Sequence, residues 1–303
     1  MRLTFISLLL SDIMKYRDLL PLFLVCLLGF SASAQDNYLV AKSFYIHKGD
    51  KMDVMLLAGS QFKDIDEYKY DASKTKKFTL YTPGKTVNLM LAAKDSASPV
   101  LGGTKMPDAG LTMVEMVRVI PPTAIDHDDY AKYLGDEGLT KLADQVTNSN
   151  QQSFREKKTC YMKTLVMVDK PSGSEFEKPL GDEYEIVLKQ NPYKLNYGSD
   201  LVGVVYYKGK PVKSEGVDVF LKAPSGNIYT DRKTTDAKGE FNVTVTREGI
   251  YLLRCARTVA STGTDADFET IQTSFTFLFN SNNDDTIDYQ SFGIRDREKV
   301  KKP

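Results

Sequence analysis

The sequence predicts an all-β protein, a β-rich chain of two β-sandwich domains, the first of which carries a short helical insert. Three observations lead to this class. After residue 44, hydrophobic and polar residues alternate with a period of two, the pattern of strands with one buried face. Turn residues separate these runs, and helical spacing is confined to residues 126–147. The chain has 303 residues, 42% of them hydrophobic, which is enough for two cores.

Residues 1–34 are predicted to be a secretory signal peptide. An apolar run at residues 19–30 follows basic residues and precedes small ones, and we expect cleavage after Ala34. Met1 and Met14 are both candidate start residues, because a signal peptide of ordinary length begins at Met14. An uncleaved anchor is the alternative, but the run is shorter than the roughly 18–20 residues of a spanning helix. The mature protein is expected to be periplasmic or secreted, with no membrane span after cleavage.

The first domain is expected to cover residues 35–180. Its strands are predicted at residues 52–56, 87–91, 111–117 and 154–168, where apolar side chains alternate with polar ones. Within the insert, Tyr130, Tyr133 and Leu134 have helical spacing, and Gly138 interrupts it. The insert therefore reads as two short helices.

The second domain is expected to cover residues 181–281 and to be a β-sandwich. Six short strands with turn signals between them are predicted at residues 184–188, 201–207, 217–221, 241–246, 250–256 and 273–279. Residues 282–303 are polar and are expected to form a flexible tail, with a weak edge strand near residues 287–292.

Charge and cysteine content limit the partners. There are 40 Lys and Arg against 40 Asp and Glu, so the chain has no basic field for a nucleic acid backbone, and no nucleic acid partner is expected. After cleavage only Cys160 and Cys255 remain. An oxidising compartment would allow them to pair, and two buried thiols are the alternative.

Catalytic signatures are missing from the sequence. It contains no nucleophile elbow, zinc-protease helix, phosphate loop, dinucleotide-binding glycine pattern or paired-cysteine redox motif. Only His47 and His127 could serve as imidazole bases. We therefore expect that the protein is not an enzyme.

One segment is a candidate metal site. Asp126, His127, Asp128 and Asp129 provide carboxylate and imidazole donors for a divalent transition metal. The same residues begin the predicted insert, where acidic side chains cap a helix and complement its dipole without any metal. Capping is the favoured interpretation.

Several short motifs occur in order along the chain, namely Lys48-Gly49-Asp50, Asp108-Ala109-Gly110-Leu111, Tyr130 to Leu134, Arg155-Glu156, Leu180-Gly181, Asn191-Pro192-Tyr193, Gly209-Lys210-Pro211-Val212 and Thr235-Asp236 with Gly239 and Phe241. Together they resemble one family, the bacterial periplasmic domain-of-unknown-function proteins related to nickel and cobalt uptake (NikM-like). The resemblance implies a transthyretin- or immunoglobulin-like C-terminal domain and a role in metal uptake. Relatives carry histidines near the mature N-terminus and in the loop at residues 59–62, where this chain has Gln35 to Tyr38 and Ser60.

Together these features predict a secreted, non-catalytic binding protein. The first hypothesis is an accessory of metal-ion (nickel- or cobalt-type) or nutrient uptake, with a metal ion or small ligand and an envelope transport component as its partners. The alternative is a structural or adhesion module of the cell envelope that binds protein or glycan.

Overall fold

The computed structural model describes residues 36–282. The expected signal peptide, the start residue and the edge strand near residues 287–292 lie outside these residues. Within the described part, none of the helices has the length and apolar character needed to cross a membrane.

The described chain is mostly β-strand. Its strands are β1 (Asp36–Ala41), β2 (Tyr45–Ile46), β3 (Lys51–Ser60), β4 (Lys63–Tyr68), β5 (Thr75–Thr82), β6 (Lys85–Asn88), β7 (Leu101–Lys105), β8 (Gly110–Asp126), β9 (Ser153–Val168), β10 (Tyr184–Leu188), β11 (Asp200–Tyr207), β12 (Lys210–Pro211), β13 (Gly216–Lys222), β14 (Ile228–Thr234), β15 (Glu240–Thr244), β16 (Gly249–Ala260) and β17 (Phe268–Phe279). The α-helices are α3 (His127–Asp136) and α4 (Thr140–Thr147), and 3-10 turns lie at Glu175–Glu177 and Pro192–Lys194. The expected all-β class and the two short helices are confirmed.

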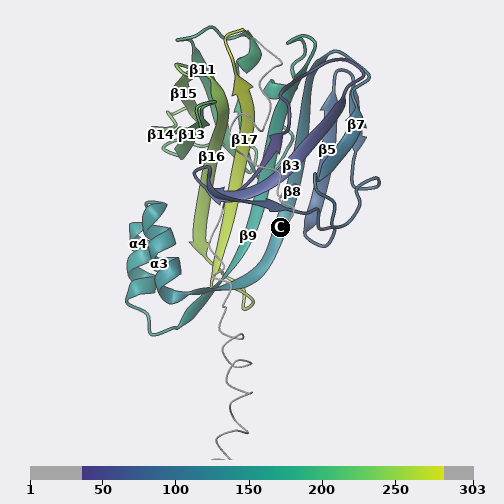
Figure 1. The fold of residues 1–303 in the computed structure, drawn as a ribbon. Coiled ribbons are helices and arrows are strands. Elements are labelled where there is room, and N and C mark those ends of the chain that lie inside the picture. Colours follow the sequence, from purple (N-terminus) through teal and green to yellow (C-terminus); the bar gives the residue numbers. More distant parts are fainter. Residues whose placement is uncertain (1–35, 283–303) are drawn as a thin grey trace, which may run out of the picture.

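One large sheet runs through both halves of the chain, and we call it the shared sheet. Its strand order is β14-β13-β16-β17-β9-β8-β5-β6, and β2 pairs with β9. Strand β17 pairs with β16 in antiparallel fashion and with β9 in parallel fashion. Figure 1 shows β16, β17, β9 and β8 side by side through the middle of the molecule.

Two smaller sheets lie on opposite faces of the shared sheet. The β1 sheet contains β1, β3, β4 and β7, and the β11 sheet contains β10, β11, β12 and β15. The Thr276 hydroxyl donates to the Leu39 carbonyl of β1 at 2.6 Å. Lys163, which is in register with Phe275, donates to Glu185 of β10 at 2.7 Å. Because neighbouring residues of a strand point to opposite faces, these contacts place the β1 sheet on one face and the β11 sheet on the other.

The arrangement differs from two separate sandwiches divided near residue 181. Strand β9 belongs to the first half and β17 to the second, yet they are paired from Glu156 to Thr164. One cluster of buried hydrophobic side chains also includes residues of both halves. The alternation of hydrophobic and polar residues predicts which face of a strand is buried, but it does not predict which strand pairs with it. The sequence pattern therefore did not show that β17 pairs with a strand of the first half. The boundary itself stays a prediction.

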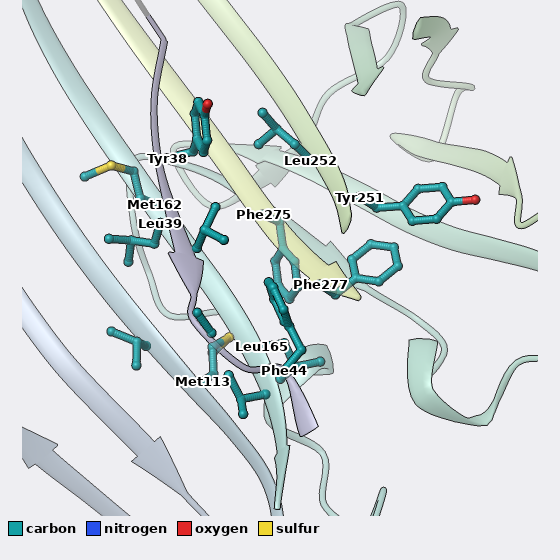
Figure 2. Close-up of a cluster of buried hydrophobic side chains, with 14 of the residues drawn as sticks. Tyr38, Leu39, Phe44, Met113, Met162, Leu165, Tyr251, Leu252, Phe275 and Phe277 are labelled. Atoms are coloured by element: carbon teal, nitrogen blue, oxygen red, sulfur yellow. The ribbon is translucent and has the colours of Figure 1, made fainter. Parts of the chain in front are cut away.

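Aromatic and aliphatic side chains fill the core on both sides of β17. Figure 2 labels Tyr38 and Leu39 of β1 and Phe275 and Phe277 of β17 among the buried side chains of this core. The rings of Tyr251 and Phe277 stack at 5.2 Å between centroids. The alternation of phenylalanines with polar residues along β17 is the pattern that predicts this strand.

A long hairpin carries the helical insert beyond the edge of the core. Strands β8 and β9 pair from Gly110 to Asp126, with a register shift between Ile120 and Thr123, where two prolines cannot donate to the ladder. At the end of this hairpin α3 and α4 pack on a separate small core (Figure 1). Its buried members are Ile125, Tyr130, Leu134, Val146, Phe154 and Phe268.

The predicted strand at residues 87–91 is too long. Strand β6 ends at Asn88, whose side chain accepts a hydrogen bond from the Met90 amide at 2.9 Å. The Leu89 carbonyl then accepts from the amides of Ala92 and Ala93, which closes a turn. Leu91 is 91% exposed, because asparagine's local hydrogen bonding redirects the chain here.

Cys160 and Cys255 are buried free thiols. Cys160 is in register with Gln272, and Cys255 is in register with the next residue, Thr273. The two thiols therefore lie on opposite faces of the shared sheet, with β17 between them, and cannot form a disulfide with each other.

Candidate functional site

The predicted metal residues lie at the start of α3. Asp126 is the N-cap, and its carboxylate accepts from the Asp128 amide at 3.0 Å. The ring nitrogens of His127 lie 2.8 Å from the Asp128 carboxylate and 2.8 Å from the Val146 carbonyl. Both partners are acceptors, so only the protonated imidazole satisfies both contacts, and the hydrogen bond to Asp128 raises the His127 pKa.

These contacts agree with helix capping. In the part of the chain that the structure describes, no three His, Cys, Asp or Glu side chains are placed to hold a metal ion. Asp129 lines a different feature, described next. A metal at residues 126–129 stays a prediction.

A cleft of about 870 Å³ lies between α3, the start of the β1 sheet and the end of the shared sheet. It is lined by Asp36, Ser60, Gln61, Asp129, Lys132, Tyr133, Asp136, Glu137, Asp218, Phe220, Thr230, Asp231, Arg232 and Arg254. We call it the Arg254 cleft. No histidine or cysteine is among these lining residues.

Arg254 forms the floor of the cleft, with a side chain that is only 2% exposed. Its Nε lies 2.6 Å from Asp36, one terminal nitrogen lies 2.9 Å from Glu137, and the other lies 2.8 Å from Asp218. Three carboxylates from different elements therefore surround one guanidinium. Such a buried charge is tolerated only with this degree of pairing, because its desolvation costs several kcal/mol.

The fold brings these four residues together from distant parts of the sequence. Asp218 and Arg254 are direct partners on β13 and β16, where they face the same side. Asp36 begins β1, which crosses that face, and Glu137 follows α3 at the end of the β8–β9 hairpin. Arg254 thus links the helical insert, the β1 sheet and the shared sheet.

The cleft carries an excess of acidic groups. Its lining contains six carboxylates and three basic side chains. Asp136 and Glu137 also lie at the C-terminal end of α3, whose last turn has no basic residue. The negative end of the helix dipole adds to their charge, so this wall of the cleft favours a cation.

Burial changes the titration of groups at the floor. The pKa of Asp36 is raised, chiefly because burial disfavours its charged form, and Arg254 opposes this shift. Burial likewise raises the pKa of Tyr133, whose hydroxyl has no hydrogen-bond partner. The phenol is therefore neutral and has a donor available at the cleft.

The sequence motifs did not identify Arg254, Asp36 or Asp218. A signal was present, because Arg254 interrupts the apolar run at residues 250–255, and a charge inside a core strand requires a buried partner. The partners themselves follow only from the pairing of β13 with β16 and the crossing of β1.

Comparisons with known proteins give a family but no activity. A family model described as a domain of unknown function, DUF4198, matches residues 32–258. No curated protein matches the chain.

Two solved structures show a distant likeness. A tetra-tandem repeat in the extending region of a large adhesion protein is 11% identical, with 81% of this chain and 50% of that chain covered and a TM-score of 0.21. This chain thus spans about half the length of that structure. The D0-D1 domain of intimin is 11% identical, with 81% of this chain and 98% of that chain covered and a TM-score of 0.20.

Proposed function

The chain belongs to the DUF4198 family of domains of unknown function, and from that premise we propose that it is an exported, non-catalytic binding protein that holds a positively charged ligand in the Arg254 cleft. The observation that carries the proposal is the cleft itself, with about 870 Å³ of space and six carboxylates against three bases. Its volume is within the range of about 300–1,000 Å³ that is typical of small-molecule sites.

The α3 wall offers two anchoring points for such a ligand. Asp129 and Asp136 both line the cleft and are seven residues apart. This spacing corresponds to about 10.5 Å along the axis of α3. It also places both residues on nearly the same side of the helix. Asp136 pairs with Lys132 at 2.6 Å, but both side chains are mostly exposed. Exposed pairs of this kind contribute little free energy, so a ligand ammonium can replace Lys132 at small cost.

The predicted signal peptide and the family resemblance support an uptake role for this binding. An accessory protein of metal-ion or nutrient uptake, including the nickel- and cobalt-type systems, would present its cargo to an envelope transport component. Carboxylates are suitable donors for hard and borderline divalent cations, and they also pair with organic ammonium groups. Separate titrations with metal ions and with organic amines distinguish these two kinds of cation.

Isothermal titration calorimetry on the purified protein tests the proposal. One arm uses Ni²⁺, Co²⁺, Zn²⁺ and Ca²⁺, and the other uses linear diamines of increasing length. We expect saturable binding of at least one cation that weakens at least tenfold in the Asp129→Asn/Asp136→Asn protein. Asp144→Asn, on the exposed side of α4 and outside the cleft, is the matched control and should bind normally. Binding that is unaffected by the double substitution, or no binding in either arm, would refute the proposal.

A structural or adhesion module is the second candidate. It is favoured by β14, which is the terminal strand of the shared sheet and has exposed residues at positions 229–232. A partner strand can add to such an edge. Capture of a defined envelope protein or glycan that persists in the Asp129→Asn/Asp136→Asn protein would favour this alternative.

A further inference from the structure

A buried cluster of carboxylates lies between β8 and the segment that leads from the first half of the chain into the second. We infer that Glu115 and Asp182 share one proton at neutral pH, and that this proton holds residues 178–183 against the shared sheet. The inference concerns a part of the molecule away from the Arg254 cleft and does not depend on the proposed function.

The two carboxyl groups are buried and adjacent. The Glu115 side chain is fully buried and that of Asp182 is 5% exposed. Lys77 Nζ lies 2.8 Å from a Glu115 oxygen and 3.3 Å from an Asp182 oxygen, so both carboxyl groups contact the same ammonium group. Tyr81 donates its hydroxyl to the other Glu115 oxygen at 2.7 Å.

Around Glu115 and Asp182, the buried carboxyl groups outnumber the lysines by one, and one bound proton would balance this charge. The groups that face it are Lys77 and Tyr81 on β5, Tyr161 and Lys163 on β9, Glu185 on β10, and Glu183, which is partly exposed and pairs with Lys208. Three buried carboxylates, at positions 115, 182 and 185, therefore meet two lysines. Both tyrosines are neutral, since burial raises their pKa values.

Glu185 has donors of its own within the cluster. Lys163 donates to it at 2.7 Å, and the amides of Leu180 and Gly181 donate at 2.9 and 3.1 Å. Lys77 is then the one cation left for both Glu115 and Asp182 among the described residues that face them. The unbalanced negative charge falls on this pair.

A missing hydrogen-bond donor at Asp182 also favours a proton between the two carboxyl groups. The second carboxylate oxygen of Asp182 is buried and has no hydrogen-bond partner. A buried acceptor without a donor costs about 1–3 kcal/mol, and a proton shared with Glu115 supplies the missing donor. In agreement, burial and the neighbouring Asp182 raise the pKa of Glu115 to about 7.

The shared proton makes docking of this segment dependent on pH. Because the pKa of Glu115 is higher in the folded protein than in the unfolded chain, the folded state binds the extra proton. Its stabilising contribution is complete below the ordinary glutamate pKa and is lost as the pH rises through about 7. Above that pH, two adjacent carboxylates repel each other beside a single lysine.

The first experiment compares the free energy of unfolding of the full protein with that of Glu115→Gln across the pH range. In the wild type, relative to the variant, the folding equilibrium constant should fall by up to about tenfold per pH unit between roughly pH 5 and pH 7. Asp182→Asn should remove the same dependence. Glu185→Gln is the matched control within the cluster, and it should weaken the fold at every pH without removing the slope.

Two readouts do not depend on overall stability. Infrared spectra at pH 6 should show a protonated carboxyl band that is absent from both Glu115→Gln and Asp182→Asn. Hydrogen exchange at the amides of Leu180 and Gly181, corrected for the intrinsic effect of pH, should accelerate above pH 7 in the wild type but not in Glu115→Gln. An equal pH slope in wild type and Glu115→Gln, or a carboxyl band that persists in both variants, would overturn the inference.

Discussion

Replacement of Arg254 by methionine tests whether the floor of the cleft is a buried charge cluster. The substitution keeps most of the side-chain volume but removes the cation that contacts Asp36, Glu137 and Asp218 at 2.6–2.9 Å. Three carboxylates that are 6–18% exposed would remain without it. Removal of one partner from a buried ion pair costs about 3–5 kcal/mol, and we expect a loss of that size.

Urea unfolding at pH 8, followed by tyrosine fluorescence, measures this loss. Arg232→Met is the matched control, because Arg232 contacts the same Asp218 at 3.2 Å but is 55% exposed. It should cost less than about 1 kcal/mol. The loss in Arg254→Met should shrink at pH 4, because burial raises the pKa of Asp36 and this carboxyl takes up a proton more readily there. Asp36→Asn should recover about 1–3 kcal/mol in the Arg254→Met background. Equal losses for Arg254→Met and Arg232→Met would refute the reasoning.

Three further predictions concern the core, the thiols and the helical insert. Phe277→Ala should cost about 3–5 kcal/mol in urea unfolding, because Phe277 is fully buried and stacks on Tyr251. Addition of a reductant should leave the melting temperature unchanged, since Cys160 and Cys255 are free and separated by β17; a shift would reveal a disulfide. The His127 pKa is raised in the folded state, so the contribution of its protonated ring is present at low pH and lost as the pH rises through the folded pKa. Amide exchange in α4 should therefore increase with pH beyond the intrinsic effect, and His127→Gln should abolish this excess.

The elements that the sequence predicts well are those whose residues follow a clear period of two or 3.6. Residues 273–279 alternate phenylalanines with small polar residues, and they lie in β17 as expected, although every one of these residues is buried. The insert at residues 126–147 has helical spacing and a capping aspartate, and it forms α3 and α4. In both cases the local pattern agrees with the element that forms, so the pattern is sufficient to predict the element.

Strands β14 and β1 are among the elements that the sequence misses. Strand β14 is exposed along most of its length, and β1 is buried at every position, so neither alternates. Strand β1 is held instead by backbone carbonyls that accept from the side chains of Gln272 and Thr276 on β17. Hydrophobic periodicity contains no information about such contacts between strands far apart in the chain.

The same limit explains why the metal segment could be found and the cleft could not. Asp126 to Asp129 are neighbours in sequence, and their donors are visible in a short window. Asp36, Glu137, Asp218 and Arg254 are separated by more than 200 residues in total and meet only because β16 pairs with β13 beneath β1 and α3. Strand pairing brings the residues of this cleft together, so the cleft cannot be recognised before the register of the paired strands is known.

The position of β17 decides how the two halves depend on each other. The family model ends at residue 258, inside β16, yet β17 lies between β16 and β9 in the shared sheet. A chain that ended there would leave two central strands with open edges, so the matched region by itself lacks the strand that joins its halves. The Arg254 cleft is built from β1 and α3 of the first half and from β13 and β16 of the second. A ligand bound there contacts both halves, so its binding free energy stabilises the chain as a whole and not one half alone.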